Sequence, residues 1–399
     1  MEQLISKYRR LQSTVSTKYV RGIYDTINWN ARAISIQGAR GTGKSTLMLQ
    51  HVLKSELPIE QSLYVSLDDL WFRDNPVIDL ATEFIHLGGK LLLLDEVHKY
   101  PDWQQVIKNI YDFNPDLQLI VSGSSIIALQ EALPDLGRRV LTYQMPELSL
   151  REFIGLKHNI DLPRISWDDL LKKHQQISYD YIRVLDYPLK FLKEHQEFGA
   201  YPFFLEGESD YSMRLNQLIN LVIDYDLPDV LPIETSSRNK LKQLLYILST
   251  SVPFTPNISK LARQLDLTRT RLLEMLHILE RAQLIQTLRS EATGVSLLNK
   301  PEKVYLKNTN LIHLLSNGLP EKGNIRETWM LSQLSGAGFT LTYPKQGDVI
   351  VNGGVTIEIG GKNKSKKQLS GIQKGIVAKD DIEHGIGSTI PLWLIGFLY

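Results

Sequence analysis

Residues 38–46 read Gly-Ala-Arg-Gly-Thr-Gly-Lys-Ser-Thr, and they directly follow the apolar run Ala33–Gln37. The first eight of these residues match the pattern G-x-x-x-x-G-K-[ST], in which glycines let successive backbone N–H groups turn towards one anion. An apolar strand before the pattern and a helix beginning near Lys44 are the setting in which it holds phosphate, because the N-terminus of the helix adds its positive dipole. The stretch therefore predicts strand, phosphate-binding loop and helix, which is the beginning of an α/β domain.

The residues of this loop have different expected roles. We expect Lys44 to bridge the β- and γ-phosphates of a nucleoside triphosphate, and Ser45 to ligate Mg²⁺. ATP and Mg²⁺ are accordingly the expected cofactors. The expected nucleotide-binding residues are Gly38, Ala39, Arg40, Gly41, Thr42, Gly43, Lys44, Ser45 and Thr46.

A second stretch supports the same site. Residues 91–96 read Leu-Leu-Leu-Leu-Asp-Glu, an apolar run typical of a buried central strand that ends in two acids. Acids at the carboxyl end of a parallel strand lie where an α/β sheet binds its ligand. We expect Asp95 to hold Mg²⁺ through water, and Glu96 to act as the general base on the attacking water.

Further candidates are less specific. Residues 119–125, Leu-Ile-Val-Ser-Gly-Ser-Ser, end another apolar run, and Ser124, with Ser122 as the alternative, would place a catalytic hydroxyl near the general base. Such serines also occur simply as turn formers.

Arg138 and Arg139 would stabilise the negative charge of the transition state, in a site of the same chain or of a neighbouring subunit. The competing interpretation is a pair of surface arginines bound to acids.

Composition limits the classes of protein to which the chain can belong. Its 399 residues predict two or three domains, and 43% hydrophobic with 22% charged residues is the balance of an ordinary globular protein. A net charge of +1 excludes a global electrostatic attraction to nucleic acid, and the absence of cysteine excludes disulfides and thiol chemistry. With no long apolar run, we expect a soluble cytoplasmic protein without a membrane partner.

Apolar runs that alternate with amphipathic stretches predict a parallel sheet flanked by helices in residues 1–150. Residues 151–240 read as helices, interrupted at the turn-like Gly199–Pro202, and predict a helical lid. Residues 241–310 and 311–399 then predict two smaller domains. The expected strands are Ala33–Gln37, Leu63–Ser66, Leu91–Asp95, Leu119–Ser122, Val140–Gln144, Leu284–Leu288, Val295–Leu298, Val304–Leu306, Phe339–Tyr343, Val349–Val351 and Val355–Ile359.

With these motifs the chain resembles the AAA+ ATPases, and more narrowly a bacterial and archaeal group that joins an AAA ATPase core to a C-terminal domain of uncharacterised function. The matching stretches are GARGTGKST (38–46), LLLLDEVHKYPDW (91–103), IVSGSS (120–125), DLGRR (135–139) and LSLREF (148–153). The resemblance implies an α/β fold: a P-loop core with five strands (1–150), a helical lid (151–240), a winged helix (241–310) and a restriction-nuclease-like C-terminal domain (311–399). It also implies ATP turnover, and a site that a neighbouring subunit completes.

The winged-helix prediction depends on a short helix, Asn257–Gln264, and a longer one, Thr268–Arg281, with Thr268 as its N-cap. If the second helix entered a DNA groove, Arg269 and Thr270 would reach base edges and Arg289 would meet phosphate. Its exposed face is mixed in charge, so a structural or protein-docking module is the alternative to DNA binding.

In the last domain, Asp348 followed by Glu358 and Lys362 resembles the pattern of a metal-dependent nuclease, and Glu327 on a preceding helix would complete an acidic cluster around Mg²⁺. The acid and the lysine stand four residues apart, whereas the pattern has them two apart on one strand face. The intervening Gly360-Gly361 also weakens the strand. We expect no vigorous nuclease activity.

Three functions follow from these observations. The first is a Mg²⁺-dependent ATPase whose nucleotide state repositions its C-terminal modules, which would contact a protein, DNA or a second copy of the chain. The second is an ATP-dependent nuclease or nucleic-acid remodelling factor. The third is a nucleotide-gated interaction protein with little hydrolysis, and Glu96 argues against it.

Overall fold

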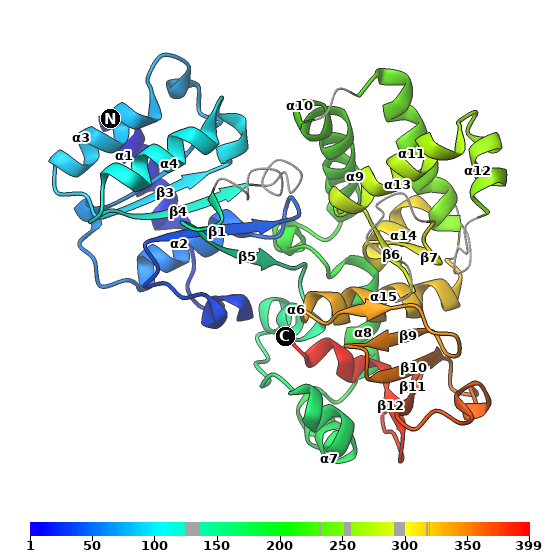
Figure 1. Cartoon of the computed structure of the whole chain (residues 1–399). Coiled ribbons are helices and arrows are strands. Elements are labelled where there is room, and N and C mark those ends of the chain that lie inside the picture. Colours follow the sequence, from blue (N-terminus) through cyan, green and yellow to red (C-terminus); the bar gives the residue numbers. More distant parts are fainter. Residues whose placement is uncertain (124–135, 231–232, 251–256, 291–299, 317, 319) are drawn as a thin grey trace. The chain divides into compact units, whose positions relative to one another are not determined.

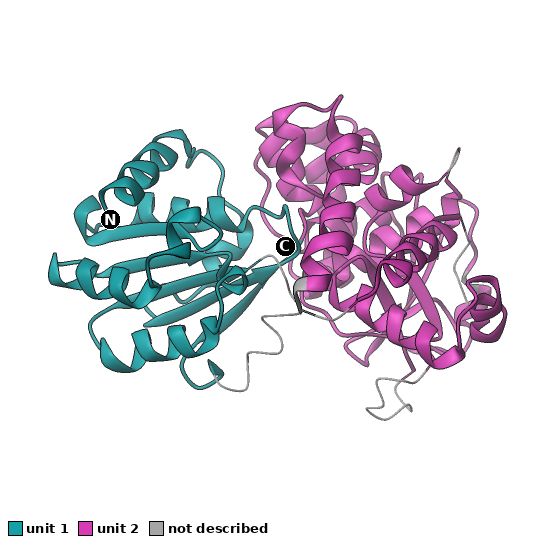
Figure 2. Ribbon diagram, turned by 90° about the horizontal axis from the view of Figure 1, so that it is seen from above, with its two compact units in different colours: residues 1–146 teal, residues 147–399 magenta. Residues whose placement is uncertain are grey.

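The computed structural model describes residues 1–123, 136–230, 233–250, 257–290, 300–316, 318 and 320–399. Within them the chain forms two compact units, residues 1–146 and residues 147–399 (Figure 2). Each unit has a five-stranded sheet of its own.

All strands of the first sheet run parallel, in the order β2-β3-β4-β1-β5. The strands are β1 (Ala33–Gly38), β2 (Ser62–Ser66), β3 (Leu91–Asp95), β4 (Gln118–Gly123) and β5 (Leu141–Met145). This arrangement confirms the predicted α/β fold with a parallel five-stranded core. Because the strands are parallel, their carboxyl ends meet at one edge of the sheet.

Helices cover both faces of this sheet (Figure 1). The helices are α1 (Glu2–Thr14), α2 (Lys44–Lys54), α3 (Val77–His86) and α4 (Trp103–Phe113). Helix α2 connects β1 to β2 at one side of the sheet, whereas α3 and α4 connect β2 to β3 and β3 to β4 in the opposite direction across the sheet. Because such connections are right-handed, α2 lies on one face of the sheet, and α3 and α4 lie on the other. Short 3-10 helices occupy the connections: η1 (Gly22–Thr26), η2 (Ile59–Gln61), η3 (Leu70–Arg73) and η4 (Val97–Lys99).

The centre of the first unit is strand β3, whose four leucines, residues 91–94, are fully buried. A fully buried leucine contributes about 1.5–3 kcal/mol, so this run holds β3 in the middle of the core between β2 and β4. Asp95 is the last residue of β3, so it lies at the carboxyl edge of the sheet.

The second unit begins with helices, as the sequence predicts for residues 151–240. These are α6 (Leu150–His158), α7 (Trp167–Leu185), α8 (Pro188–Phe198), α9 (Tyr211–Leu221), α10 (Leu227–Val230) and α11 (Thr235–Thr250). The 3-10 helix η5 (Pro202–Glu206) follows α8, and the π-helical turn η6 (Val222–Asp226) joins α9 to α10. Helices α12 (Ile258–Gln264), α13 (Arg269–Arg281), α14 (Thr309–Leu315) and α15 (Lys322–Gly336) come next.

The strands of this unit form a hairpin and a mixed sheet. The hairpin pairs β6 (Ile285–Leu288) with β7 (Lys303–Leu306). The sheet has the order β12-β11-β10-β9-β8, with β8 (Leu341–Thr342), β9 (Val349–Val351), β10 (Val355–Gly360), β11 (Gly375–Lys379) and β12 (Thr389–Pro391). The 3-10 helices η7 (Lys366–Leu369) and η8 (Leu392–Phe397) complete the unit.

The sequence-based strand predictions agree with the structure in position, with small differences in length. The expected strand Phe339–Tyr343 is shorter, Leu341–Thr342, and the sequence analysis missed β11 and β12. The expected strand Val295–Leu298 lies outside the described residues. Helix η8 packs against α6, α7, α8 and α15, so the segments predicted as lid and as C-terminal domain share one compact unit. The finer division of residues 151–399 stays a prediction.

A buried histidine holds several helices of this unit together. His195 on α8 accepts a hydrogen bond from the indole N–H of Trp329 on α15, with 2.8 Å between Nδ1 and Nε1, and its Nε2 lies 2.9 Å from the carbonyl oxygen of Leu148. Both ring nitrogens are thereby satisfied in the neutral form. Burial lowers the pKa of His195 to about 4, so the ring stays uncharged at neutral pH.

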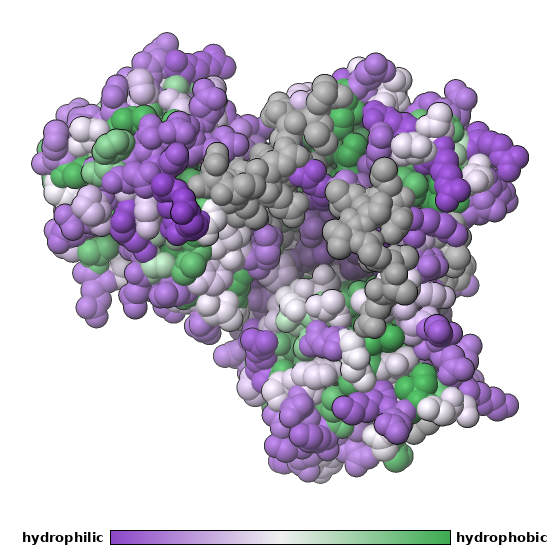
Figure 3. All heavy atoms as spheres, viewed as in Figure 1, coloured by the Kyte–Doolittle hydropathy of each residue, from purple (hydrophilic) through white to green (hydrophobic). Residues whose placement is uncertain are grey.

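Polar residues cover most of the surface seen in Figure 3, with apolar residues scattered among them. Scattered exposed hydrophobic residues such as Phe113, Tyr187 and Ile386 are ordinary on a folded chain. None of the helices in the described part of the chain is both long and apolar enough to cross a bilayer.

Candidate active site at the carboxyl edge of the parallel sheet

The predicted phosphate-binding loop lies between β1 and α2, as expected. Gly41 and Gly43 have φ of 80° and 94°, the left-handed region in which a side chain is strained. Gly43 is also the N-cap of α2, so the backbone turns from the strand into the helix over a few residues. The loop therefore has the conformation that directs backbone N–H groups towards one side, together with a helix N-terminus behind them.

Gly38 is a glycine for a different reason. It is the last residue of β1 and pairs with Met145 on β5, and a Cβ atom at position 38 would stand 2.5 Å from the carbonyl oxygen of Met145. Real Cβ atoms do not approach an oxygen so closely. The first glycine of the motif is thus required by the packing of two neighbouring strands.

Lys44 is buried against the loop. Its Nζ donates hydrogen bonds to the carbonyl oxygens of Gly38 and Ala39, at 3.1 and 2.9 Å. Thr42 fastens the loop further, since its Oγ1 donates to the carbonyl oxygen of Ala39 at 2.9 Å. The ammonium group therefore lies over the loop, where it would meet the phosphates of a nucleotide bound there.

Asp95 and the loop come together as the sequence predicts. The hydroxyl of Ser45 donates to Oδ2 of Asp95 at 2.5 Å, although the two residues are 50 positions apart. Oδ1 accepts hydrogen bonds from the backbone N–H of Glu96, at 3.0 Å, and from the hydroxyl of Ser122 on β4. A hydroxyl beside a carboxylate is an oxygen donor set of the kind that Mg²⁺ prefers, so these residues fit the expected cation.

Tyr64 belongs to this site, and the sequence analysis missed it. Its hydroxyl reaches from β2 and donates to Oδ2 of Asp95 at 2.6 Å. Burial raises the pKa of Tyr64 well above its ordinary value, and the neighbouring charge of Asp95 adds to this effect. The only signal in the sequence is a hydroxyl-bearing ring within the buried strand Leu63–Val65, and such rings usually belong to the core.

Glu96, the expected general base, directly follows β3 and adopts a left-handed conformation with φ of 52°. Its Oε2 lies 3.5 Å from Nε2 of the buried His98. A positive φ in a residue other than glycine costs of the order of 1 kcal/mol or more, and such outliers cluster at functional sites. Seven other described residues that are not glycine also have a positive φ, so this conformation does not single out Glu96, whose catalytic role stays a prediction.

The other predicted catalytic residues have different outcomes. Ser124 lies outside the described residues, whereas its alternative, Ser122, is buried and bonded to Asp95. Arg139 forms a bidentate pair with Asp112, with Nε and Nη2 at 2.7 and 2.9 Å from the two carboxylate oxygens. Arg138 is exposed. The part that either arginine plays at an ATP site stays a prediction.

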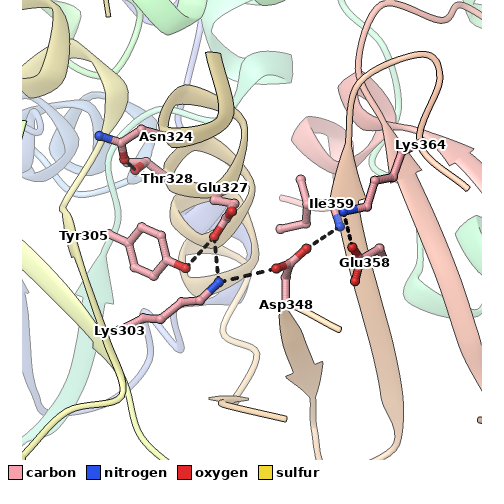
Figure 4. A network of polar contacts seen from close by, with 9 residues as sticks. All are labelled: Lys303, Tyr305, Asn324, Glu327, Thr328, Asp348, Glu358, Ile359 and Lys364. Atoms are coloured by element: carbon pink, nitrogen blue, oxygen red, sulfur yellow. Dashed lines mark hydrogen bonds and ion pairs between the residues drawn. The ribbon is translucent and has the colours of Figure 1, made fainter. Parts of the chain in front are cut away.

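The acids of the predicted second site lie in one network with two lysines that the sequence analysis did not include (Figure 4). Lys303, on β7, places Nζ 3.1 Å from Glu327 of α15 and 3.3 Å from Asp348, which precedes β9. The hydroxyl of Tyr305 also donates to Glu327, at 2.6 Å. An ammonium group, which is itself a cation, therefore lies between two of the acids expected to bind Mg²⁺.

The third acid, Glu358, is buried on β10 and forms an ion pair with Lys364. The side chain of Lys364 runs past Gly360, where a Cβ atom would collide with it. Lys362, the lysine of the predicted pattern, contributes its carbonyl oxygen as the acceptor of a hydrogen bond from Lys379, at 3.0 Å. Among the described residues, no three His, Cys, Asp or Glu side chains are grouped so as to hold a metal ion.

The helices α12 and α13 begin as the sequence predicts. Asn257 and Thr268 are their N-caps, and the oxygen of each side chain accepts a hydrogen bond from a backbone N–H of the first turn. Arg269 and Thr270 are exposed at the start of α13, whereas Arg289 is bound to Glu280 at 2.9 Å. Three helices followed by a hairpin are compatible with a winged helix, which stays a prediction.

Comparison with known protein families covers both units of the chain. Residues 30–154 match the model of an AAA domain. This match contains the glycine loop together with Tyr64, Asp95, Glu96 and Ser122. Residues 189–322, beyond the AAA domain, match a domain of unknown function, DUF8612.

A protein of Methanocaldococcus jannaschii is similar over most of the chain. The uncharacterised protein MJ1637 of Methanocaldococcus jannaschii is 26% identical over 385 residues, which cover 88% of this chain and 81% of that protein. Among solved structures, the Walker-type ATPase PABY2304 of Pyrococcus abyssi has a TM-score of 0.41 at 12% identity, over 72% of this chain and 91% of that one. The ORC1 protein of Aeropyrum pernix, solved in complex with DNA, has a TM-score of 0.31 at 14% identity, over 78% and 91%.

Proposed function

We propose that the AAA domain binds ATP together with Mg²⁺ and hydrolyses it. The observation that carries the proposal is the contact between Ser45 and Asp95, at 2.5 Å, beside the glycine loop. This contact joins a candidate metal ligand to the carboxylate expected to hold a metal-bound water. The AAA-domain match over residues 30–154 supports the same conclusion from the family side.

The residues of the site divide the chemistry between them. The backbone N–H groups of residues 39–45 and the ammonium of Lys44 bind the phosphates, while Ser45 and Asp95 would hold Mg²⁺, which neutralises charge on the phosphates. Glu96 takes a proton from the attacking water. Ser122 holds Asp95 in place, and Arg138 is the candidate for an additional positive charge at the transition state.

We further propose that the nucleotide state of the loop repositions the second unit, residues 147–399. Support comes from Arg21, whose Nη1 donates to the carbonyl oxygen of Thr42 in the loop at 2.8 Å. Nη2 of the same side chain donates to the carbonyl oxygen of Pro146 at 2.9 Å. Pro146 is the last residue of the first unit, so one buried guanidinium links the loop to the point where the chain leaves that unit.

Two contacts bear on the kind of partner that the second unit would bind. Arg289, which was expected to meet DNA phosphate, is engaged by Glu280, and Lys303 lies between two acids of the predicted nuclease site. Neither arrangement favours a nucleic-acid function over a protein-docking one. Phosphate release with and without DNA and RNA would separate these alternatives.

Isothermal titration of ATP into the wild-type chain and into Lys44→Ala tests the binding site. We expect the variant to bind no ATP, because the loop loses the charge that is expected to bridge the β- and γ-phosphates. Lys90→Ala is the matched control, since Lys90 is an exposed lysine of the same unit. Unchanged affinity in Lys44→Ala would refute the proposed site.

A further inference from the structure

The contact between Tyr64 and Asp95 connects a strand outside the known loop motifs to the metal side of the site. Tyr64 lies on β2 opposite Leu93 of β3, and Ser66 is the residue opposite Asp95. The tyrosine ring therefore stands two positions before the carboxylate, on the same strand face as Ser66, and its length brings the hydroxyl to Oδ2. No residue of the loop is needed to make this bond.

Asp95 accepts hydrogen bonds on both of its oxygens. Ser45 and Tyr64 donate to Oδ2, and Ser122 and the N–H of Glu96 donate to Oδ1. A carboxylate has about four acceptor positions, so these donors define its orientation completely.

The donors differ in what happens to them when a cation binds. Ser45 is itself a candidate ligand of Mg²⁺, so its hydroxyl changes surroundings with the metal. Ser122 and the N–H of Glu96 hold only Oδ1. Tyr64 is the other donor to Oδ2, and it lies outside the glycine loop and is buried, with 7% exposure. Oδ2 is also the oxygen that meets Ser45, and thus the one that faces the expected cation.

We propose that Tyr64 is a positioning residue for Mg²⁺: its hydroxyl holds Oδ2 of Asp95 towards Ser45 and thereby sets the affinity of the site for magnesium-bound ATP. The inference rests on the proposed function. It assigns to Tyr64 no contact with the nucleotide or with the attacking water. Loss of the hydroxyl therefore weakens the effect of Mg²⁺ on binding and leaves the binding of metal-free ATP unchanged.

The test is a titration of Mg²⁺ against ATP binding, measured at equilibrium by calorimetry, with EDTA as the metal-free reference. Tyr64→Phe keeps the ring and its packing and removes only the donor. Hydrogen bonds in the second layer around a metal typically change its affinity 10- to 100-fold, so we expect Tyr64→Phe to need at least about ten times more Mg²⁺ for half of the effect. Its affinity for ATP in EDTA should equal that of the wild type.

Tyr8→Phe is the matched control. Tyr8 is also buried, and its hydroxyl contacts Ser62 of β2 at 2.8 Å and not Asp95. We expect the wild-type Mg²⁺ midpoint in this variant. Circular dichroism melting of each variant verifies that the fold is retained.

A double-mutant cycle separates positioning from a general effect on the sheet. In an Asp95→Asn background, Tyr64→Phe should cause no further change in the Mg²⁺ midpoint, because the oxygen that it orients has lost its charge. An unchanged midpoint in Tyr64→Phe, or an equal shift in both backgrounds, overturns the inference. Absence of ATP binding by the wild type would instead refute the proposed function itself.

Discussion

Nε1 of Trp329 lies 2.8 Å from Nδ1 of His195, and this hydrogen bond joins α15 to α8 inside the second unit. The indole N–H can only donate, so the histidine nitrogen that faces it must accept. A protonated imidazole has no acceptor and would oppose the indole N–H directly. The contact therefore exists only while the histidine is neutral.

Acid should consequently destabilise this unit through His195. Its folded-state pKa is lowered from 6.5 to about 4, so between these values the unfolded chain binds a proton that the folded chain does not bind. The free energy of unfolding should fall by about 3 kcal/mol as the pH falls from 6.5 to 4. Urea denaturation over this range should show a smaller fall in His195→Gln, whereas the exposed His86→Gln should behave as the wild type does.

Glu96→Gln should bind ATP as tightly as the wild type and lose turnover, because an amide keeps the shape of the side chain and cannot accept the proton of the attacking water. A base of this kind contributes about 10²–10⁴-fold, which gives the expected loss. Phosphate release and calorimetry measure the two quantities, with the exposed Glu83→Gln as the control. Hydrolysis at the wild-type rate would show that Glu96 is not the base.

The two adjacent arginines should differ. Arg139 is held by Asp112 in a bidentate pair, whereas Arg138 is exposed and available to a nucleotide site of another copy of the chain. We expect Arg138→Ala to reduce turnover at least about tenfold with little effect on ATP affinity, and Arg139→Ala to retain most of the turnover. Turnover per chain that is independent of protein concentration, and indifferent to Arg138→Ala, would contradict a site shared between subunits.

Lys303 should matter for stability. Its replacement by methionine leaves Glu327 and Asp348 without the charge between them, and loss of one partner from a buried ion pair costs about 3–5 kcal/mol. Chemical denaturation of Lys303→Met should show a loss of this order. Lys172→Met is the control, since Lys172 and its partner Asp168 are mostly exposed, and it should leave the stability unchanged.

A companion variant distinguishes charge from packing in this network. Adding Glu327→Gln to Lys303→Met removes one of the two carboxylate charges that the first substitution leaves unpaired, so part of the lost stability should return. Because methionine keeps most of the aliphatic length of lysine, no recovery would mean that the unpaired charge of Glu327 is not the cause of the lost stability.

The first unit could be predicted well because its signals are local. The glycine loop and the four leucines before Asp95 are contiguous, and each specifies a strand end without knowledge of the rest of the chain. The parallel order of the strands then brings the loop and Asp95 to one edge. The contact of Tyr64 with Asp95 depends on the register of β2 against β3, which no local pattern encodes.

In the second unit the informative contacts are between distant residues. Lys303 on β7 forms ion pairs with Glu327 and Asp348, and no pattern in the sequence near position 303 predicts these pairs. Whether Lys362 or Lys364 pairs with Glu358 depends on how the chain turns after β10. Gly360 has no side chain, and the side chain of Lys364 occupies the space beside it, which only the structure shows. Strand β12 has only three residues, which is too short for a periodic pattern in the sequence.

The close approach of Gly38 to Met145 affects how this motif is interpreted in other sequences. Because a strand partner excludes any side chain at position 38, a homologue that has lost all affinity for nucleotide would still keep glycine there as long as its β1 and β5 stay paired. The presence of the first glycine in a homologue therefore indicates that β1 and β5 are paired, and does not by itself indicate that nucleotide binds. Lys44 and Ser45 contact the ends of β1 and β3 through their side chains, and the pairing of β1 with β5 does not require either side chain, so loss of Lys44 or Ser45 is the change that would mark a descendant without the activity.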